Sequence, residues 1–408
     1  MMPSFGPKRR VLLGAAAALP VIGRARAQGT RPMKIGVLND QSGPYRDIAG
    51  LGSVWSAKLA AQDMAGGIGC EVVTADHQNK PDAGAAIARQ WFDRDGVDMI
   101  IDVNTSSVAL AVNNVCKEKD KAYINVGAAT TDLTGAQCTP VTVHWSYDTY
   151  MLARSTGGAV AKAGGNTWYF ITADYVFGQQ LQRDTTGFVE QAGGKVLGAS
   201  PYPFPGTTDF SSFLVSAQAS GAKVLGLANA GTDTVNSIKQ AAEFGLTRKM
   251  NIAALLMYIS DVHGLGLEAA QGLYMTESFY WDLDDMTRAF AKRWQSGYPS
   301  VKPNMDTAGV YAGSLHYLKA CKAVGAAEAH RSGAAVVAAM KKMPTDDEAF
   351  GKNTIREDGL ALLPAYLFQV KTPAESKQPW DYLKVIATTP ANEAWKPLKD
   401  GGCSLVKA

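Results

Sequence analysis

Residues 34–38 read Lys-Ile-Gly-Val-Leu, a short apolar run that is followed by a helical pattern over 49–64. The same alternation continues along the first third of the chain. Further strands are expected at 71–74, 99–103 and 123–126, with helices at 82–93 and 107–119. Continuous apolar strands that alternate with helices indicate a parallel sheet covered on both faces.

The alternation restarts after an extended stretch at 132–147. Strands are expected at 168–171, 195–197, 224–227, 252–255 and 273–275. Helices are expected at 178–191, 209–219, 233–244 and 262–270. Two similar halves predict an α/β fold with two doubly wound parallel-sheet lobes.

A third section supplies helices first, at 284–296 and 305–324, and then strands, at 366–370 and 383–386. If the helices cover one lobe and the strands join the other, the chain crosses between the lobes three times. We expect this three-segment hinge near 145–148, 279–282 and 350–355. Lobe one then combines 33–147 with 282–350, and lobe two combines 148–281 with 351–408.

Five short motifs stand in one order along the chain. They are Ile35-Gly36-Val37-Leu38 with Ser42-Gly43-Pro44-Tyr45, Asp102-Val103-Asn104-Thr105-Ser106-Ser107, Ala128-Ala129-Thr130, Asp174-Tyr175-Val176-Phe177-Gly178, and Gln240-Ala241-Ala242-Glu243-Phe244-Gly245. In this order the chain resembles the type I periplasmic substrate-binding proteins of ABC transporters, in the branched-chain amino acid (Leu/Ile/Val-binding) class. The resemblance implies a protein that closes two lobes around a small ligand and delivers it to a membrane permease.

Ser106 and Thr130 are the candidate anchors for a ligand carboxylate. Each follows an expected strand of the first lobe, and ligands of doubly wound sheets bind beyond the carboxyl ends of strands. A hydroxyl beside backbone N–H groups at a helix N-terminus suits an anion. Both residues could equally be plain helix N-caps. Given the resemblance, we expect a carboxylate clamp in which Ala128 and Ala129 leave room and contact the ligand through their backbone.

One departure from the family pattern concerns the ligand's amino group. Amino-acid-binding relatives carry an acid after the fourth strand of the second lobe, whereas this chain reads Ala254-Leu255-Leu256-Met257-Tyr258, with no acid before Asp261. A buried ammonium without a counter-charge costs on the order of several kcal/mol. We therefore expect a carboxylate without an α-amino group, such as an aromatic, keto or short aliphatic acid. Amino acid binding is the alternative, with Asp148 as the remaining ammonium partner, although helix capping suits Asp148 better.

Aromatic residues of the motif loops are expected to cover the ligand body, because a planar or apolar ligand favours an aromatic wall. Tyr45, Tyr175 and Phe177 are the three assigned to the site. Other aromatic residues near the expected lips are better explained as core residues; these are Trp145, Tyr147, Tyr150, Phe279, Tyr280 and Trp281. His144 is a candidate hinge hydrogen-bond residue.

Enzymatic motifs are missing from the sequence. It contains no GxSxG, HExxH or Walker pattern, and its five histidines show no metal-ligand spacing. The GxGxxA match at 264–269 lacks the acid that a dinucleotide site needs about 20 residues on. We expect a binding protein without catalytic activity, cofactor or metal. A ligand-sensing partner of a signalling receptor has the same fold and remains an alternative to transport.

Five cysteines, Cys70, Cys116, Cys138, Cys321 and Cys403, form no CxxC pair, which disfavours zinc and thioredoxin-like sites. In an oxidising compartment a disulfide is plausible. Cys138 and Cys403 both stand in flexible, glycine-containing stretches, so their pairing is the first expectation and Cys116–Cys138 the second. Cys116 and Cys321 fall on apolar helical faces and suit the core.

The N-terminus has the pattern of an export signal. Lys8-Arg9-Arg10 precedes an apolar run at 11–22 and the small-residue motif Ala25-Arg26-Ala27, after which cleavage is expected. Loss of the five Lys and Arg residues of that segment from a net charge of +3 leaves −2. With no basic tract, nucleic acid is an unsuitable partner. We expect a periplasmic monomer that does not insert into the membrane, binds a small carboxylate and docks on an ABC-transporter permease.

Overall fold

The computed structural model describes residues 1–4, 6 and 31–407, and residues Pro32–Ala408 form one compact unit. Most of the expected export signal, including its cleavage point after Ala27, lies outside the described residues. Within the compact unit, two parallel sheets carry the architecture. The α/β class expected from the sequence is therefore confirmed.

The first sheet has five parallel strands in the order β2-β1-β3-β4-β5. Their bounds are β1 Met33–Asn39, β2 Cys70–Asp76, β3 Met99–Asp102, β4 Ala122–Asn125 and β5 Thr142–His144. Strands β3 and β4 are buried along their whole length, which explains their continuous apolar sequence. The strand order reverses between β1 and β3, and this switch point is where doubly wound sheets bind ligands.

The second sheet repeats this plan with four parallel strands in the order β7-β6-β8-β9. Their bounds are β6 Thr167–Ala173, β7 Lys195–Tyr202, β8 Val224–Ala228 and β9 Asn251–Ala254. The switch point here lies between β6 and β8, so the loops after these two strands are the counterparts of those after β1 and β3.

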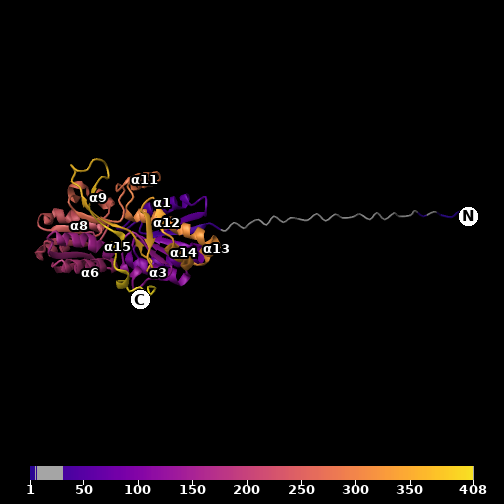
Figure 1. Ribbon diagram of the computed structural model, residues 1–408, viewed down its shortest axis with the longest axis horizontal. Helices are drawn as coiled ribbons and strands as arrows, with labels where there is room; N and C mark the ends of the chain where they lie inside the picture. The colour runs from indigo at the N-terminus through magenta and orange to yellow at the C-terminus, as the bar shows by residue number, and fades with distance from the viewer. Residues whose placement is uncertain (5, 7–30, 408) are drawn as a thin grey trace. The chain divides into compact units, whose positions relative to one another are not determined.

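Helices from distant parts of the chain cover the first sheet. The N-terminal ones are α1 Gly50–Asp63, α2 Pro81–Gln90 and α3 Ser106–Lys119. The later ones are α11 Asp285–Trp294, α12 Met305–Val324, α13 Ala326–Arg331 and α14 Gly333–Lys342. The long helix α12 packs against α1 and α14 (Figure 1). The sequence predicts α12 with its observed bounds but misses α13 and α14.

Helices of the second half surround β6–β9. They are α4 Thr149–Leu152, α5 Gly158–Lys162, α6 Val176–Gln191, α7 Ser211–Ala219, α8 Thr232–Glu243, α9 Ile259–Leu265 and α10 Leu267–Ala270. A last short helix, α15, spans Ala391–Ala394. The described part of the chain also contains single-turn helices that are not of the α type, at Trp91–Asp95, Thr131–Thr134, Ala153–Gly157, Leu246–Arg248 and Leu398–Asp400.

The C-terminal strands are antiparallel. β10 Tyr274–Glu277 pairs with β14 Ala365–Val370, which pairs with β15 Leu383–Thr389. A separate small sheet joins β11 Thr345–Asp347, β12 Gly351–Ile355 and β13 Ala361–Leu362. The backbone N–H of His144, at the end of β5, donates to Gly359 O at 2.9 Å, which places the turn before β13 beside the first sheet. The lobe boundaries, with the third crossing near 350–355, remain a proposal.

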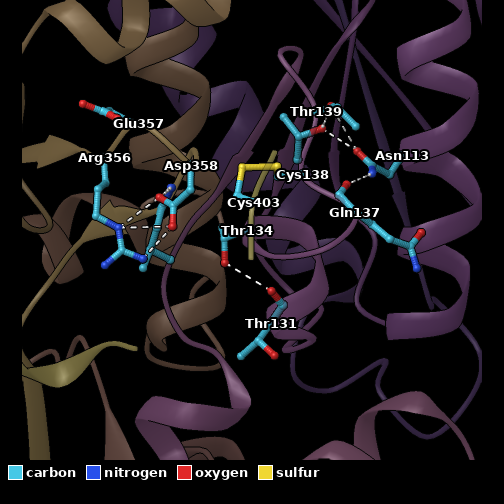
Figure 2. Close-up of a disulfide and its surroundings, with 12 residues drawn as sticks. Asn113, Thr131, Thr134, Gln137, Cys138, Thr139, Arg356, Glu357, Asp358 and Cys403 are labelled. Carbon is cyan, nitrogen blue, oxygen red and sulfur yellow. Dashed lines mark hydrogen bonds and ion pairs between the residues drawn. A yellow bond between two sulfur atoms is a disulfide. The ribbon is translucent and has the colours of Figure 1, made fainter. Parts of the chain in front are cut away.

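The C-terminal tail is fastened to a loop of the first half. Cys138 and Cys403 form a disulfide with an S–S distance of 2.04 Å across a sequence separation of 265 (Figure 2). This is the pairing that the sequence places first, and it excludes the alternative Cys116–Cys138 bond. Cys70, Cys116 and Cys321 are free thiols, and Cys116 and Cys321 are buried. A cross-link over so long a loop stabilises a folded chain by about 2–5 kcal/mol.

Candidate ligand-binding site

A pocket lies at the two switch points, between the loops that follow strands of both sheets. Its empty space is about 270 Å³. The lining residues are Tyr45, Ile48, Asn104, Ser106, Gly127, Ala129, Tyr147, Tyr175, Phe177, Ala230, Leu256 and Tyr258. Five of the seven residues that the sequence assigns to ligand binding are among them: Tyr45, Ser106, Ala129, Tyr175 and Phe177.

Ser106 is the first residue of α3, directly after the loop that leaves β3. Its side chain is buried, and its hydroxyl has no hydrogen-bond partner among the described residues. No side chain caps this helix, because the Thr105 hydroxyl donates to Asn79 instead. The first-turn N–H groups of a helix lack intrahelical acceptors and attract negative charge. Ser106 and the start of α3 therefore present uncommitted donors to the pocket.

The backbone that delivers Ser106 is strained. Asp102 and Val103 have φ angles of 81° and 59°, a left-handed conformation that is unusual for a residue other than glycine and a true outlier for valine. Strain of this kind costs on the order of 1–3 kcal/mol per residue and persists only where the surroundings impose it. Next to them, the Asn104 side-chain oxygen accepts the Asp40 N–H at 2.9 Å, which holds the loop against the loop after β1.

The loop after β4 behaves differently from the loop after β3. The Thr130 hydroxyl accepts the Asp132 N–H at 3.2 Å and so caps the short helix Thr131–Thr134. Ala128 is engaged by Asn125, whose amide nitrogen donates to Ala128 O at 2.7 Å. Thr130 and Ala128 are not among the lining residues, while Ala129 is. Among the described residues, no backbone carbonyl accepts the N–H of Ala129 or Thr130.

Aromatic side chains bring the two halves together at the mouth of the pocket. The hydroxyl oxygens of Tyr45 and Tyr175 lie 2.6 Å apart. Phe204 stacks on both rings, with centroid distances of 5.3 Å to Tyr45 and 4.5 Å to Tyr175. Burial raises the pKa of both tyrosines, so both hydroxyls stay protonated at neutral pH. The backbone adds a further link, since the N–H of Thr232 donates to Pro44 O at 3.1 Å.

The wall from the second sheet carries no charge. Ala230, Leu256, Phe177, Tyr175 and Tyr258 line it, and none of the twelve lining residues is a carboxylate. Asp261, the first acid after β9, accepts the Tyr258 N–H at 2.9 Å within its own helical turn and is not among the lining residues. Burial raises its pKa to about 7.

Asp148 and His144 lie at and next to the stretch 145–148, where the first crossing is expected. Asp148 caps α4 by accepting the Met151 N–H at 2.8 Å, and burial raises its pKa to about 7. It is not among the lining residues, which agrees with helix capping. His144 Nε2 lies 2.8 Å from the carbonyl oxygen of Tyr147, and burial lowers the pKa of the imidazole to about 4. His144 is therefore neutral at physiological pH and holds the backbone beside pocket residue Tyr147.

The sequence does not predict several of the residues that line the pocket. Those not assigned to the site in advance are Ile48, Asn104, Gly127, Tyr147, Ala230, Leu256 and Tyr258. Asn104 and Gly127 could have been found, because each stands within two residues of an assigned motif position. Phe204, which stacks on both mouth tyrosines, lies in the loop after β7 and has no neighbouring motif.

The described residues contain neither a membrane-spanning helix nor a cluster of metal ligands. No helix in this part of the chain is long and apolar enough to cross a membrane. Within the same residues, no group of three or more His, Cys, Asp or Glu side chains is arranged to hold a metal ion.

The known proteins that this chain resembles most clearly are periplasmic binding proteins. The profile described as "Periplasmic binding protein" matches residues 32–378. A periplasmic binding protein of Burkholderia mallei is 48% identical, with a TM-score of 0.88, over 92% of this chain and 99% of that one. A branched-chain amino acid ABC transporter periplasmic ligand-binding protein of Burkholderia xenovorans LB400 is 36% identical, with a TM-score of 0.79, over 91% and 99%.

More distant similarity is of two kinds. The Leu/Ile/Val-binding protein homolog 4 of Brucella abortus (strain 2308) is 26% identical over 251 residues, which are 58% of this chain and 59% of that protein. The chain thus spans about three fifths of the length of the curated relatives it matches. A solute-binding protein of R. palustris, solved with benzoate, is 20% identical with a TM-score of 0.80 over 92% and 100%, and it shows the fold alone.

Proposed function

The chain belongs to the periplasmic binding protein family, and from this premise we propose that it binds a small carboxylate for delivery by an ABC importer. Members of this family bind and transport solutes, so we assign no catalytic activity. The periplasm is the proposed location, with the expected signal removed, and a permease is the proposed membrane partner. We propose that the protein acts as a monomer.

The ligand carboxylate is proposed to sit at the start of α3. The unpartnered Ser106 hydroxyl would donate to one carboxylate oxygen, with the first-turn N–H groups of the helix beside it. Ala129 and Thr130 would donate through their backbone N–H groups from the next loop. The Thr130 hydroxyl contributes by capping its helix rather than by contacting ligand. The ligand body would then face Tyr45, Tyr175 and Phe177, which line the pocket.

The proposed ligand class is supported by the chemistry of the two pocket walls taken together. Buried donors without partners lie on one wall, and the other wall lacks any carboxylate. An α-ammonium group placed in this pocket would lose its hydration and find no counter-charge, at a cost on the order of several kcal/mol. We therefore propose an acid without an α-amino group, of aromatic, keto or short aliphatic type.

Closure completes the proposed mechanism. Tyr45 and Tyr175 come from opposite halves, so their contact forms only when the halves approach each other. Closing over the ligand removes water from the carboxylate and strengthens its hydrogen bonds. The closed form would then be the one that a permease receives.

Calorimetry with matched acid pairs tests the proposal. The pairs are leucine with 2-oxo-4-methylpentanoate, phenylalanine with phenylpyruvate, and alanine with pyruvate, with benzoate as a fourth acid. We expect each keto acid to bind more tightly than its amino acid. Tighter binding of leucine would instead agree with the Leu/Ile/Val-binding relative and refute the assigned ligand class, while binding of none of these compounds would refute the carboxylate proposal as a whole.

A further inference from the structure

Glu277 is a buried carboxylate outside the pocket, at the end of β10. Its two oxygens accept backbone N–H groups from different parts of the chain. The N–H of Ile259 donates to Oε1 at 3.0 Å, and the N–H of Met305 donates to Oε2 at 3.3 Å. One side chain thus joins segments that are 46 residues apart in sequence.

Each donor is the first residue of a helix, and the two helices belong to different halves. Ile259 opens α9, which follows β9 of the second sheet and packs against α8. Met305 opens α12, which packs against α1 beside the first sheet. Glu277 itself is tied to the second half through its neighbour Thr276, whose hydroxyl donates to Ser155 Oγ at 2.8 Å. The hydrogen bonds of Glu277 therefore link the second half to the first.

Both helix starts adjoin the pocket. Ile259 directly follows the lining residue Tyr258. On the other side, Asn304 precedes Met305, and its amide nitrogen donates to the carbonyl oxygen of Ile48, which also lines the pocket. A change in the spacing of the two helix starts would move one pocket wall relative to the other.

Burial and hydrogen bonding shift the pKa of Glu277 in opposite directions. Burial raises the pKa of this carboxyl to about 8, with a smaller contribution from Asp261, while the two backbone N–H groups favour the charged form. Helix N-termini stabilise a nearby negative charge. A carboxyl group offers two acceptor oxygens, one for each N–H, whereas a glutamine amide offers only one.

We propose that Glu277 is a positioning residue that sets the spacing of the two pocket walls by holding the N-termini of α9 and α12 on its two carboxylate oxygens. This role goes beyond the proposed function, because it concerns how the halves are oriented and holds for any ligand of the pocket. Glu277 would not touch the ligand.

Glu277→Gln is the first test, because the amide keeps the shape but has only one oxygen to offer two N–H groups. Small-angle X-ray scattering of the ligand-free protein should show a larger radius of gyration than the wild type. Benzoate affinity, measured by calorimetry, should fall about tenfold, as expected for the loss of one hydrogen bond that positions the pocket walls. Asp347→Asn is the control, since this half-buried acid accepts two N–H groups, from Ala349 and Phe350 of its own turn, on the single oxygen Oδ1.

A second pair of variants removes a donor instead of the acceptor. Proline suits the first position of a helix and lacks an N–H, and the extended backbone of Asn304 tolerates a following proline. Met305→Pro and Met305→Ala both truncate the side chain, but only the proline variant loses the bond to Glu277. We expect the proline variant to bind benzoate about tenfold more weakly than the alanine variant.

The outcomes separate cleanly. Unchanged scattering and affinity in Glu277→Gln, with a melting temperature lowered as in Asp347→Asn, would make Glu277 a structural residue and overturn the proposal. If Glu277→Gln does not fold, equal affinities of the two Met305 variants would overturn it. If wild-type protein binds no acid, the proposed function fails on its own, and the ligand-free scattering still decides the role of Glu277.

Discussion

The two walls of the pocket rest on sheets of the same strand order, yet they offer a ligand different chemistry. The first wall presents the unpartnered Ser106 hydroxyl at an uncapped helix start. The second wall presents Ala230 and Leu256, and the first acid after Leu256, Asp261, accepts a backbone N–H of its own helical turn. The strand order thus determines where the crevice lies. Which polar side chains are free of hydrogen-bond partners determines what the crevice can bind.

The same contrast exists within the first wall. Ser106 and Thr130 both follow strands of one sheet, and both have a hydroxyl beside a helix start. The Thr130 hydroxyl is occupied by the Asp132 N–H, whereas the Ser106 hydroxyl has no partner among the described residues. A hydroxyl that caps its own helix has less to offer a ligand than one that the fold leaves unsatisfied.

Gly231→Ala should produce the largest effect, because it breaks the fit between the two walls. A Cβ at Gly231, where φ is +60°, would lie 2.4 Å from the carbonyl oxygen of Pro44 on the opposite half. Closure over a ligand would then be blocked, and we expect benzoate affinity to fall at least ~100-fold by calorimetry.

Gly221→Ala is the matched control for that variant. Gly221 has a φ of +69° but open space around its would-be Cβ, so the substitution also places alanine at a positive φ but causes no clash. It should lower the melting temperature and leave affinity nearly unchanged. Equal loss of affinity in both variants would show that strain, and not contact between the walls, explains the result.

Ser106→Ala and Thr130→Ala test the contrast within the first wall. Loss of the Ser106 hydroxyl should weaken acid binding about 10- to 100-fold, since a charge-assisted hydrogen bond contributes ~1.5–3 kcal/mol. Loss of the Thr130 hydroxyl should mainly reduce the free energy of unfolding, by about 0.5–2 kcal/mol for a cap. Calorimetry and chemical denaturation of both variants measure the two effects, and a Thr130 variant that binds as weakly as the Ser106 variant would contradict the assigned roles.

Much of this arrangement could be predicted from the sequence, for identifiable reasons. Apolar strands such as β3 and β4 are buried along their length, so their sequence alone places them inside a covered sheet. Motif loops directly after strands supplied Tyr45, Ser106 and Tyr175. The second wall of the pocket is harder to predict from the sequence. Ala230 and Leu256 are apolar and have the pattern of core residues, and only the strand order shows that they lie at the switch point.

Other features depend on contacts between distant segments. Whether Thr130 caps a helix or faces a ligand depends on where the Asp132 N–H lies, which no local pattern shows. The sequence does not predict α13, α14 or the pairing of β11 with β12, because these elements are stabilised by packing against α12 and α14 and have no strong pattern of their own. Phe204 reaches the mouth of the pocket from a loop without any motif.

Tyr175→Phe sharpens the comparison at the mouth of the pocket, with a smaller effect. The variant loses the hydroxyl contact with Tyr45 but keeps the ring stacked on Phe204. A neutral hydrogen bond contributes about 0.5–1.5 kcal/mol, so affinity should fall roughly 3- to 10-fold. Tyr45→Phe should behave alike, and the double variant should bind no worse than either single one if the pair acts as a unit.

Tyr169→Phe provides the control for the mouth variants. Its hydroxyl lies 2.7 Å from Ser200 Oγ, and both residues belong to strands of the second sheet. The control should leave acid binding unchanged in calorimetry. Reduced affinity in this variant would show that loss of any tyrosine hydroxyl of the second half, and not the contact between halves, accounts for the effect.

Asp233→Asn should have the smallest effect on binding. Asp233 is a second-half acid near the mouth tyrosines, and its carboxylate accepts the Tyr202 hydroxyl at 2.8 Å. It is not among the lining residues, so we expect benzoate affinity to change less than about twofold and the preference for keto acids over amino acids to persist. Wild-type protein that binds leucine, and loses it in this variant, would instead make Asp233 the ammonium partner.

The same substitution has a pH signature with a definite sign. Burial raises the pKa of Asp233 to about 6, above the value near ~3.9 of an unfolded chain. The folded state therefore holds its proton more tightly, so the contribution of this group to stability is complete below pH ~4 and is lost as pH rises through about 6. Subtracting the unfolding free energies of Asp233→Asn from those of the wild type between pH 4 and 8 isolates this group from the other buried acids. A difference that is flat across that range would mean that Asp233 is solvated through the open cleft, and the second wall would then hold an accessible charge after all.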